Sequence, residues 1–249
     1  MDNKKFRLEL TSFALHILAM IFMVFDHIWG VFATNGYLWM TCIGRLTYPI
    51  FAFMIVEGYF KTKNLKKYVL RLLVFALISE IPFNLVMSSS WFSPLHQNVL
   101  WTFLIGILLI FLNEKARAKK LWIRALVLVG TVLLGTLLGI VSFVDYGHGG
   151  VLIILAFYVF RGRKWWCLVG QLVSLLYISF EVISGQFIPI TLFGNTFELI
   201  IQSFCVLALV PIWLYRGKQG PYNKAIRYLY YGFYPAHLLI LWLIRMWIL

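Results

Sequence analysis

The sequence predicts an all-α fold, a polytopic membrane helical bundle that forms one domain over residues 1–249. Composition is the first observation: 62% of the residues are hydrophobic and 12% are charged, whereas soluble domains carry about 25% charged residues. The second observation is a series of long apolar segments, and the third is the spacing of the basic residues between them. Together they exclude an ordinary soluble domain.

Apolar runs approach the roughly 20 residues that a helix needs to cross a bilayer, and we identify nine of them. The fourth and sixth are short, so the pattern allows eight to ten crossings. No internal repeat or low-complexity segment divides the chain, and the first segment lacks the cleavage pattern of a signal peptide. The nine predicted segments are 9–33, 42–60, 68–87, 98–113, 121–144, 149–160, 165–183, 197–215 and 226–248.

The basic residues follow every second apolar segment, as the positive-inside rule requires of cytoplasmic loops. We therefore expect a multi-pass protein of the bacterial cytoplasmic (inner) membrane, with a cytoplasmic amino terminus and an extracytoplasmic carboxyl terminus. The net charge of +13 is then explained by the basic cytoplasmic loops, whose natural neighbours are anionic lipid headgroups. Nucleic acid is not expected as a partner. Only Arg45 and Arg245 lie outside the clusters at 4–7, 61–71, 115–124, 161–164 and 216–227.

The three cysteines are widely spaced in apolar runs and form no metal or redox motif. We expect buried, inert thiols and no metal site. The cysteines are Cys42, Cys167 and Cys205.

Ionisable side chains inside the predicted segments are the candidates for function, because such groups are costly in hydrocarbon unless they are paired or face a wet cavity. Asp26, His27 and Arg45 stand in or beside the first two segments. On the predicted topology they share the outer half of the membrane with further polar residues and line a chamber that opens outward. A set of structural ion pairs is the alternative. The further members are Glu80, Asp145, Glu181, Glu198, His96, Asn98 and His148.

His27 is the sharpest of these candidates. Asp26 precedes it directly, but successive helical residues point about 100° apart, so we expect Asp26 to pair with Arg45 or with another helix. His16 lies eleven residues before His27, which is nearly the same helix face about 16 Å along the axis. We expect a stripe of four side chains on this face to line a tunnel: His16, Met20, Met23 and His27. Ordinary helix packing explains the two methionines equally well.

Other polar residues sit at predicted helix ends and bends. Glu80 and Asn84 are one turn apart on a segment that Pro82 bends, an arrangement that lines a cavity or seals a packing defect. Glu57 and Lys61 have the spacing of an ordinary surface pair. Further candidates, each with a structural alternative, are Asn98 with Thr102, Asp145 with Tyr146, and His237.

With these residues assembled, the chain resembles the TraX family, named for the conjugation protein that acetylates the amino terminus of F-type pilin. The resemblance is dense over residues 15–103 and patchy later. It is carried by Met23 to His27, Gly30, Ile43 to Leu46, Tyr48 to Phe53, Val56 to Tyr59, Phe75 to Phe83, Asn98, Thr102, Asp145 to Gly147, and Tyr234 to His237.

The first segment is also similar to that of the wider integral-membrane acyltransferases, in which a basic residue precedes the catalytic histidine by eleven positions. His27 matches that histidine, and His16 takes the basic position. Family members more often have Lys at position 16 and Asp at position 84, where this chain has Asn84.

The resemblance implies acetyl transfer from cytoplasmic acetyl-CoA to an amine or hydroxyl presented from outside, on a peptide amino terminus, a glycan or a lipid headgroup. His27 is implied as general base or transient nucleophile, oriented by Asp26, with Arg45 stabilising negative charge. Substrate contacts are implied for Glu80, Asn84, Asn98, Asp145, Tyr146 and His237. Contacts to the CoA phosphates are implied for His16, Lys61 and Lys63.

Two other classes of protein also explain buried charges. A secondary transporter uses them as an ion path, although it usually shows paired repeats that this chain lacks. A non-catalytic membrane scaffold or immunity protein uses them only for folding. Proton-coupled uptake without any CoA dependence would favour the transporter. Replacement of Asp26, His27 and Arg45 by polar isosteres with folding as the only loss would favour the scaffold.

Overall fold

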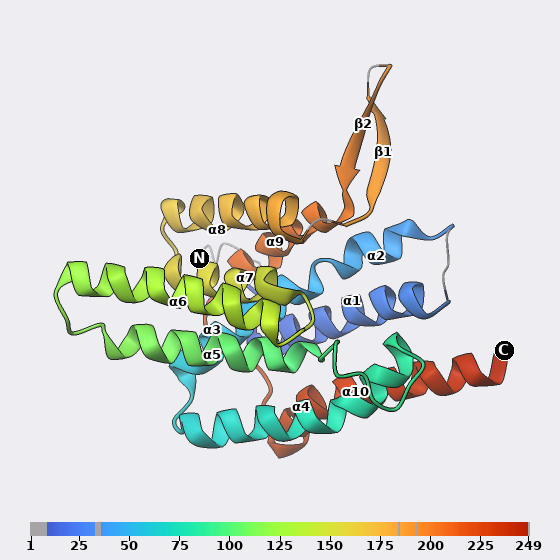
Figure 1. Ribbon diagram of the computed structural model, residues 1–249, viewed down its shortest axis with the longest axis horizontal. Coiled ribbons are helices and arrows are strands. Elements are labelled where there is room, and N and C mark those ends of the chain that lie inside the picture. The colour runs from blue at the N-terminus through green and yellow to red at the C-terminus, as the bar shows by residue number, and fades with distance from the viewer. Residues whose placement is uncertain (1–8, 33–35, 184, 193, 249) are drawn as a thin grey trace, which may run out of the picture.

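The computed structural model describes residues 9–32, 36–183, 185–192 and 194–248. It is a bundle of helices from which one two-stranded hairpin projects (Figure 1). In chain order the elements are α1 (Ser12–Phe32), α2 (Leu38–Gly44), α3 (Thr47–Lys61), α4 (Leu65–Met87), α5 (Val99–Lys115), α6 (Leu121–Val141), α7 (Gly147–Val159), α8 (Trp165–Tyr177), η1 (Ile178–Ile183), β1 (Phe187–Leu192), β2 (Asn195–Ile200), η2 (Ile201–Ala208), α9 (Leu209–Leu214) and α10 (Lys224–Ile248).

The helical fold class is confirmed, and five stretches are long and apolar enough to cross a membrane. Two further apolar helices, Gly147–Val159 and Ile201–Leu214, are shorter. Nine crossings are therefore not established by helix length. The five stretches are Ser12–Phe32, Leu38–Lys61, Leu65–Met87, Leu121–Val141 and Trp165–Ile183.

The second predicted segment consists of two helices with a break at Arg45 and Leu46. The first of them, α2, begins at Leu38, where the sequence analysis placed a loop. Pro49 lies in the first turn of α3, where a backbone N–H has no intrahelical partner, so proline is tolerated there. Pro49 thus marks the start of a helix and does not bend a continuous one.

The hairpin β1–β2 is the main departure from the expected all-helical pattern, since the sequence predicts an outward loop and the start of a helix for residues 187–200. The stretch is rich in β-branched residues, which favour strands. Pro189 disfavours a helix interior, and Gly194 has φ +80 at the turn, a conformation that suits glycine.

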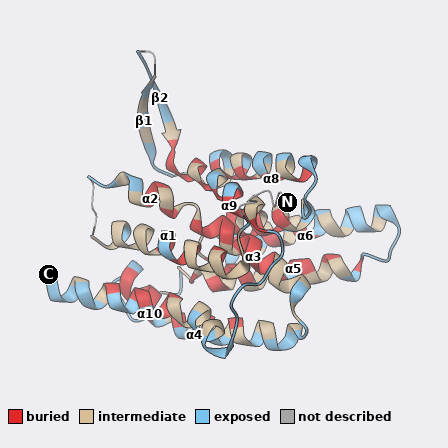
Figure 2. Ribbon diagram, turned by 180° about the vertical axis from the view of Figure 1, so that it is seen from behind, coloured by how far each residue is buried: buried red, intermediate tan, exposed pale blue. Residues whose placement is uncertain are grey.

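Helix α3 lies at the centre of the bundle, and nine of its residues are buried. Figure 2 shows buried residues concentrated around it, whereas α6 and α8 expose much of their length. The exposed face of α6 is a stripe at helical spacing, as expected for a helix that faces lipid. Its members are Leu126, Val129, Leu133, Leu137 and Ile140.

Candidate functional site

A cavity in the bundle has a volume of about 750 Å³ and is lined by His27. We call it the histidine chamber. Charged side chains from four distant parts of the chain reach its wall, so the fold gathers groups that the sequence separates. They are Asp26, Arg45, Asp145 and Arg245.

The second cavity, which we call the basic chamber, has a volume of about 310 Å³. Lys61, Arg71 and Arg227 line it, together with His16 and several tyrosines. His16 stacks on Tyr230 with ring centroids 3.9 Å apart. The wall therefore combines cations with flat rings.

The two chambers adjoin. His16 lines the basic chamber, His27 lines the histidine chamber, and Met20 of the predicted stripe lines neither. Met20 is buried in packing. The partition between the chambers is mostly apolar and aromatic, and the residues common to both walls are Met23, Phe51, Val99, Phe103 and Tyr234.

Asp26 and Arg45 form an ion pair across α1 and the end of α2, with 2.8 Å between Oδ1 and Nη2. Thr41, which the sequence analysis did not select, completes the cluster. Its hydroxyl donates to Asp26 at 2.8 Å, and Arg45 donates to the same hydroxyl at 2.8 Å. Thr41 precedes Arg45 by four residues, a spacing that places both side chains on one helix face. This spacing was the sequence signal that could have identified Thr41 as a partner of Arg45.

The Asp26–Arg45 pair depends on a close approach between the Gly44 backbone and the Asp26 side chain. A Cβ atom built there would lie well inside van der Waals contact distance of Asp26 Cβ. Glycine at this position lets α2 approach α1 closely enough for Arg45 to reach Asp26.

Substitution Gly44→Ala is therefore expected to destabilise the protein by about 1–3 kcal/mol, the usual cost of overpacking. Thermal unfolding of the purified protein in detergent measures the change. Gly130→Ala in α6 is the matched control, because its Cβ meets nothing within 4 Å and alanine is the better helix former. Equal melting temperatures for the two variants would contradict this role of Gly44.

His27 is oriented by His237 of α10. His27 Nδ1 lies 2.6 Å from His237 Nε2, and His237 Nδ1 lies 2.8 Å from the carbonyl oxygen of Phe233. A carbonyl only accepts, so neutral His237 carries its proton on Nδ1 and accepts on Nε2. His27 must then donate from Nδ1. Its Nε2 keeps a lone pair, on a side chain that lines the histidine chamber.

This arrangement corrects the orienting role that the sequence analysis gave to Asp26. Among the described residues, no hydrogen bond joins Asp26 to His27, and Asp26 bonds instead to Thr41 and Arg45. The reason is helical geometry, since adjacent residues of α1 point in different directions.

Asp145 and Tyr146 reach the histidine chamber from the turn before α7. The Asp145 carboxylate accepts from the Tyr146 N–H at 3.1 Å, and its carbonyl accepts from Thr102 at 2.7 Å. Tyr146 has φ 61 and stacks on Tyr48 with ring centroids 4.2 Å apart. These contacts fix the turn, so the carboxylate is held at the chamber wall.

His96, in the loop between α4 and α5, lies 3.8 Å from the Asp145 carboxylate. This interaction raises the pKa of His96 above its ordinary value of 6.5, and the charge of Glu80 adds to the effect. Because the pKa of His96 is higher in the folded than in the unfolded state, protonated His96 stabilises the fold below pH 6.5. This stabilisation disappears as the pH rises through the folded-state pKa.

We expect wild type to melt above His96→Gln at pH 5.5 and to match it at high pH. The two side chains are 43% and 31% exposed, so the difference is at most about 1 kcal/mol, or about 2–4 °C in melting temperature. Scanning calorimetry of both proteins across pH measures it. A difference that grows with rising pH would contradict the assignment.

Glu80, Asn84 and Asn98 line neither chamber. One carboxylate oxygen of Glu80 accepts from the Asn98 backbone N–H at 3.2 Å, from its side-chain amide, and from Trp101 Nε1 at 2.8 Å. Asn98 also caps α5 by accepting from the Leu100 N–H. In place of the expected substrate contacts, the structure shows Glu80 and Asn98 joining α4 to the start of α5.

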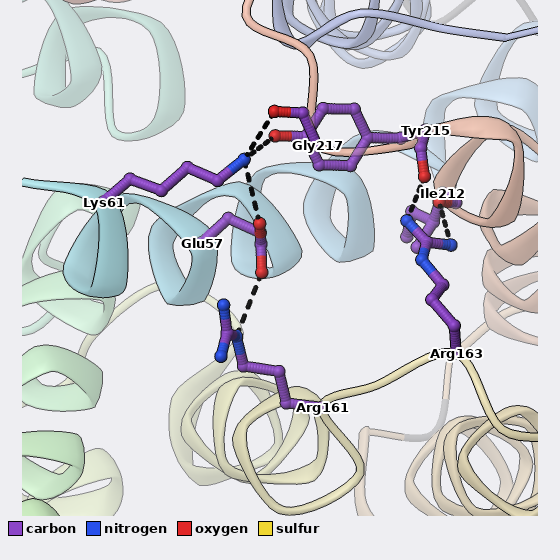
Figure 3. Close-up of polar contacts among 7 residues, drawn as sticks. All are labelled: Glu57, Lys61, Arg161, Arg163, Ile212, Tyr215 and Gly217. Carbon is purple, nitrogen blue, oxygen red and sulfur yellow. Dashed lines mark hydrogen bonds and ion pairs between the residues drawn. The ribbon is translucent and has the colours of Figure 1, made fainter.

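Lys61 is held by protein groups on the side of the basic chamber (Figure 3). Its ammonium contacts Glu57 at 3.2 Å, the Gly217 carbonyl at 3.0 Å and the Tyr215 hydroxyl. Arg161 binds the other oxygen of Glu57 at 3.0 Å. Lys61 thus lines the chamber as part of a structural network.

Arg163 donates to the carbonyl oxygens of Ile212 and Tyr215 at the end of α9 (Figure 3), where helical carbonyls lack partners. Lys63 is exposed and lines neither chamber. In the wall of the basic chamber, the cations that the sequence did not single out are Arg71 and Arg227, which it assigns only to basic clusters.

The family model described as TraX protein matches residues 12–245. The chain belongs to the TraX family. The match spans α1 to α10 and thus includes both chambers. The TraX family membership agrees with the resemblance that the sequence motifs predicted.

The TraX-family chain is also similar to the probable fimbrial assembly protein FimC, serogroup H1, of Dichelobacter nodosus. The two are 27% identical over 253 residues, which cover 94% of this chain and 95% of that protein. No solved structure matches the chain.

Proposed function

We propose that this TraX-family protein is a membrane-embedded acetyltransferase. It moves an acetyl group from cytoplasmic acetyl-CoA to an amine or hydroxyl presented from the other side of the bacterial cytoplasmic membrane. One observation carries the proposal: a chamber with an oriented histidine adjoins a chamber with a cationic, aromatic wall. Acyl transfer between substrates that enter from opposite sides needs this combination.

The histidine chamber supplies the base. The neutral acceptor nitrogen attacks the thioester carbonyl carbon, and its proton passes to His27 Nε2. The C–S bond breaks, and the CoA thiolate leaves and takes this proton from His27 to become the thiol. The hydrogen bond from His27 Nδ1 to His237 at 2.6 Å keeps Nε2 available as the acceptor. General bases of this kind typically contribute about 10²- to 10⁴-fold.

Arg45 supplies a donor for the negative charge that develops on the carbonyl oxygen. Its Nη2 is engaged by Asp26 and Thr41, whereas its buried Nε–H has no partner among the residues that the structure describes. A preorganised donor stabilises an oxyanion without the reorganisation that bulk water needs.

The basic chamber supplies the donor-side contacts. Arg71 and Arg227 line it, and the buried Nε–H of each lacks a hydrogen-bond partner in the described part of the chain. Guanidinium groups bind phosphate through such donors, and His16 stacked on Tyr230 offers a flat ring surface. These residues fit the phosphates and the adenine of CoA.

The acceptor enters the histidine chamber, where Asp145 attracts a protonated amine, which releases this proton to solvent before its nitrogen attacks. The positive-inside pattern supports a cytoplasmic amino terminus and, with it, a cytoplasmic position for the basic chamber. The name of the similar Dichelobacter protein refers to fimbrial assembly. We therefore favour the amino terminus of a pilus or fimbrial subunit as the acceptor over a glycan or a lipid headgroup.

The test uses the full chain reconstituted in liposomes, with labelled acetyl-CoA on one side and a ten-residue peptide with a free amino terminus on the other. Acetylated peptide and free CoA thiol are expected in equal amounts, with none in empty liposomes. Arg227→Gln is expected to raise the KM for acetyl-CoA, and Lys63→Gln, outside both chambers, is the matched control. Proton-coupled uptake without thiol release would overturn the proposal in favour of a transporter.

A further inference from the structure

We propose that the outer edge of β2 binds an extended segment of the acceptor polypeptide and leads its amino terminus into the histidine chamber. This inference rests on the proposed function and adds to it the mode of acceptor recognition. It starts from the hairpin, which projects away from the helices (Figure 1). Within the described residues, its sheet contains only β1 and β2.

The register determines which backbone groups face outward. Ile201 N–H donates to the Gln186 carbonyl at 2.9 Å, so this pair is hydrogen-bonded, and bonded pairs alternate with non-bonded pairs along an antiparallel ladder. Pro189 and Glu198 are opposite each other at a non-bonded position. Their backbone groups therefore point away from the partner strand, as do those of Thr191 and Thr196.

The two edges are not equivalent. On β1 the outward edge is interrupted at Pro189, which has no N–H and blocks strand addition. On β2 the outward edge at Thr196 and Glu198 has both donors and acceptors. The carbonyl of Ile200 is already engaged by Ser203 at 2.7 Å. The accessible edge is thus a short stretch of β2.

This edge is continuous with the histidine chamber. Gln186, Ile201 and Gln202, at the base of the hairpin, line that chamber together with His27. Strand β2 runs from the turn toward the chamber, so a peptide whose amino terminus enters the chamber runs antiparallel to β2. Antiparallel pairing is the more stable arrangement, and six strand residues span about 20 Å.

The chemistry of the edge selects the occupant. Open backbone groups are not tolerated in the hydrocarbon layer, and residues 184–200 contain no Lys or Arg to bind lipid phosphates. A regular row of backbone donors and acceptors pairs with another polypeptide backbone, and a glycan or lipid headgroup has no such row. Glu198, exposed on this strand, attracts a basic side chain or amine on the incoming chain.

The test compares two acceptors on the full chain in nanodiscs: the ten-residue peptide, which reaches the edge, and a single amino-acid amide, which does not. Glu198→Pro removes one outward N–H and leaves the β1–β2 ladder intact. It is expected to raise the KM for the peptide about tenfold, with kcat and the KM for the amide unchanged. Thr191→Pro is the matched control, because it removes an outward N–H from β1 instead of β2. Glu198→Gln removes the charge and keeps the backbone N–H, so it separates the effect of the carboxylate from that of the hydrogen bond.

Binding of a fluorescent peptide to the same variants is measured without acetyl-CoA. It is expected to weaken about tenfold in Glu198→Pro, less in Glu198→Gln, which keeps the backbone N–H, and not in Thr191→Pro. An unchanged peptide KM and affinity in Glu198→Pro would overturn the inference and leave the acetyltransferase intact. Equal peptide binding to empty nanodiscs would show lipid attachment and would also overturn it. Peptide binding at the edge without acetylation of either acceptor would contradict the proposed function and not the docking edge.

Discussion

Acetyl transfer by His27→Ala is expected to be lower than in wild type by about 10²- to 10⁴-fold in kcat/KM, the range that a general base usually supplies. The loss follows from the geometry, because His27 Nε2 is the accepting nitrogen of a ring whose Nδ1 is engaged by His237 at 2.6 Å. Label transfer from acetyl-CoA to the ten-residue peptide measures it in reconstituted protein.

His237 provides the control for this prediction. In His237→Gln the side-chain oxygen replaces Nε2 as acceptor for His27, whereas His237→Leu leaves the Nδ1–H of His27 without that partner. An unsatisfied buried donor costs about 1–3 kcal/mol, so His237→Leu is expected to lower kcat by about 5- to 150-fold. His237→Gln is expected to recover most of the rate. Full activity in His27→Ala would remove the histidine from the mechanism.

Removal of the Asp26 carboxylate is expected to cause the largest loss of stability. Asp26→Ala leaves the Arg45 guanidinium inside the bundle without its 2.8 Å partner. Breaking a buried pair on one side costs about 3–5 kcal/mol. The two side chains are only 15% and 23% exposed, so we expect about 3 kcal/mol, measured as the free energy of unfolding in detergent and urea.

The double variant Asp26→Ala with Arg45→Met separates pairing from packing. It removes both charges and is expected to be more stable than Asp26→Ala alone, because no unpaired charge remains. A double variant that loses the sum of the two single losses would show that Asp26 and Arg45 act independently.

Helix positions were predictable from the sequence where the apolar runs are long. The runs at 9–33, 68–87 and 121–144 correspond to α1, α4 and α6. Each run is long and apolar enough to form a helix that could cross a bilayer. The hairpin was not predicted, because the turn formers Gly194 and Asn195 indicate a loop as readily as a hairpin turn, and periodicity alone does not separate a short apolar strand from the start of a helix.

The candidate site divides in the same way. The Asp26–Arg45 pair was predictable, because an acid and a guanidinium at similar depth in apolar segments have few other means of neutralisation. The partner of His27 was not, because His237 lies 210 residues away and its orientation depends on how α10 packs against α1. The sequence predicts Glu80 and Asn98 as site residues because they are polar residues in or beside apolar segments. That they join two helices instead cannot be read from their sequence positions.

By itself, the sequence determined that this protein is an apolar helical bundle of the TraX type, since only helices and closed barrels satisfy their backbone hydrogen bonds in hydrocarbon. It also determined that the charges inside the apolar segments must be paired or face a polar cavity, because an isolated charge in hydrocarbon is costly. The tertiary structure alone decided which of those charges meet and which nitrogen of His27 is free. It also decided that two chambers share a wall, and that one strand edge leads into the larger. These properties depend on contacts between residues far apart in the chain, whose distances and directions are fixed only when the helices pack.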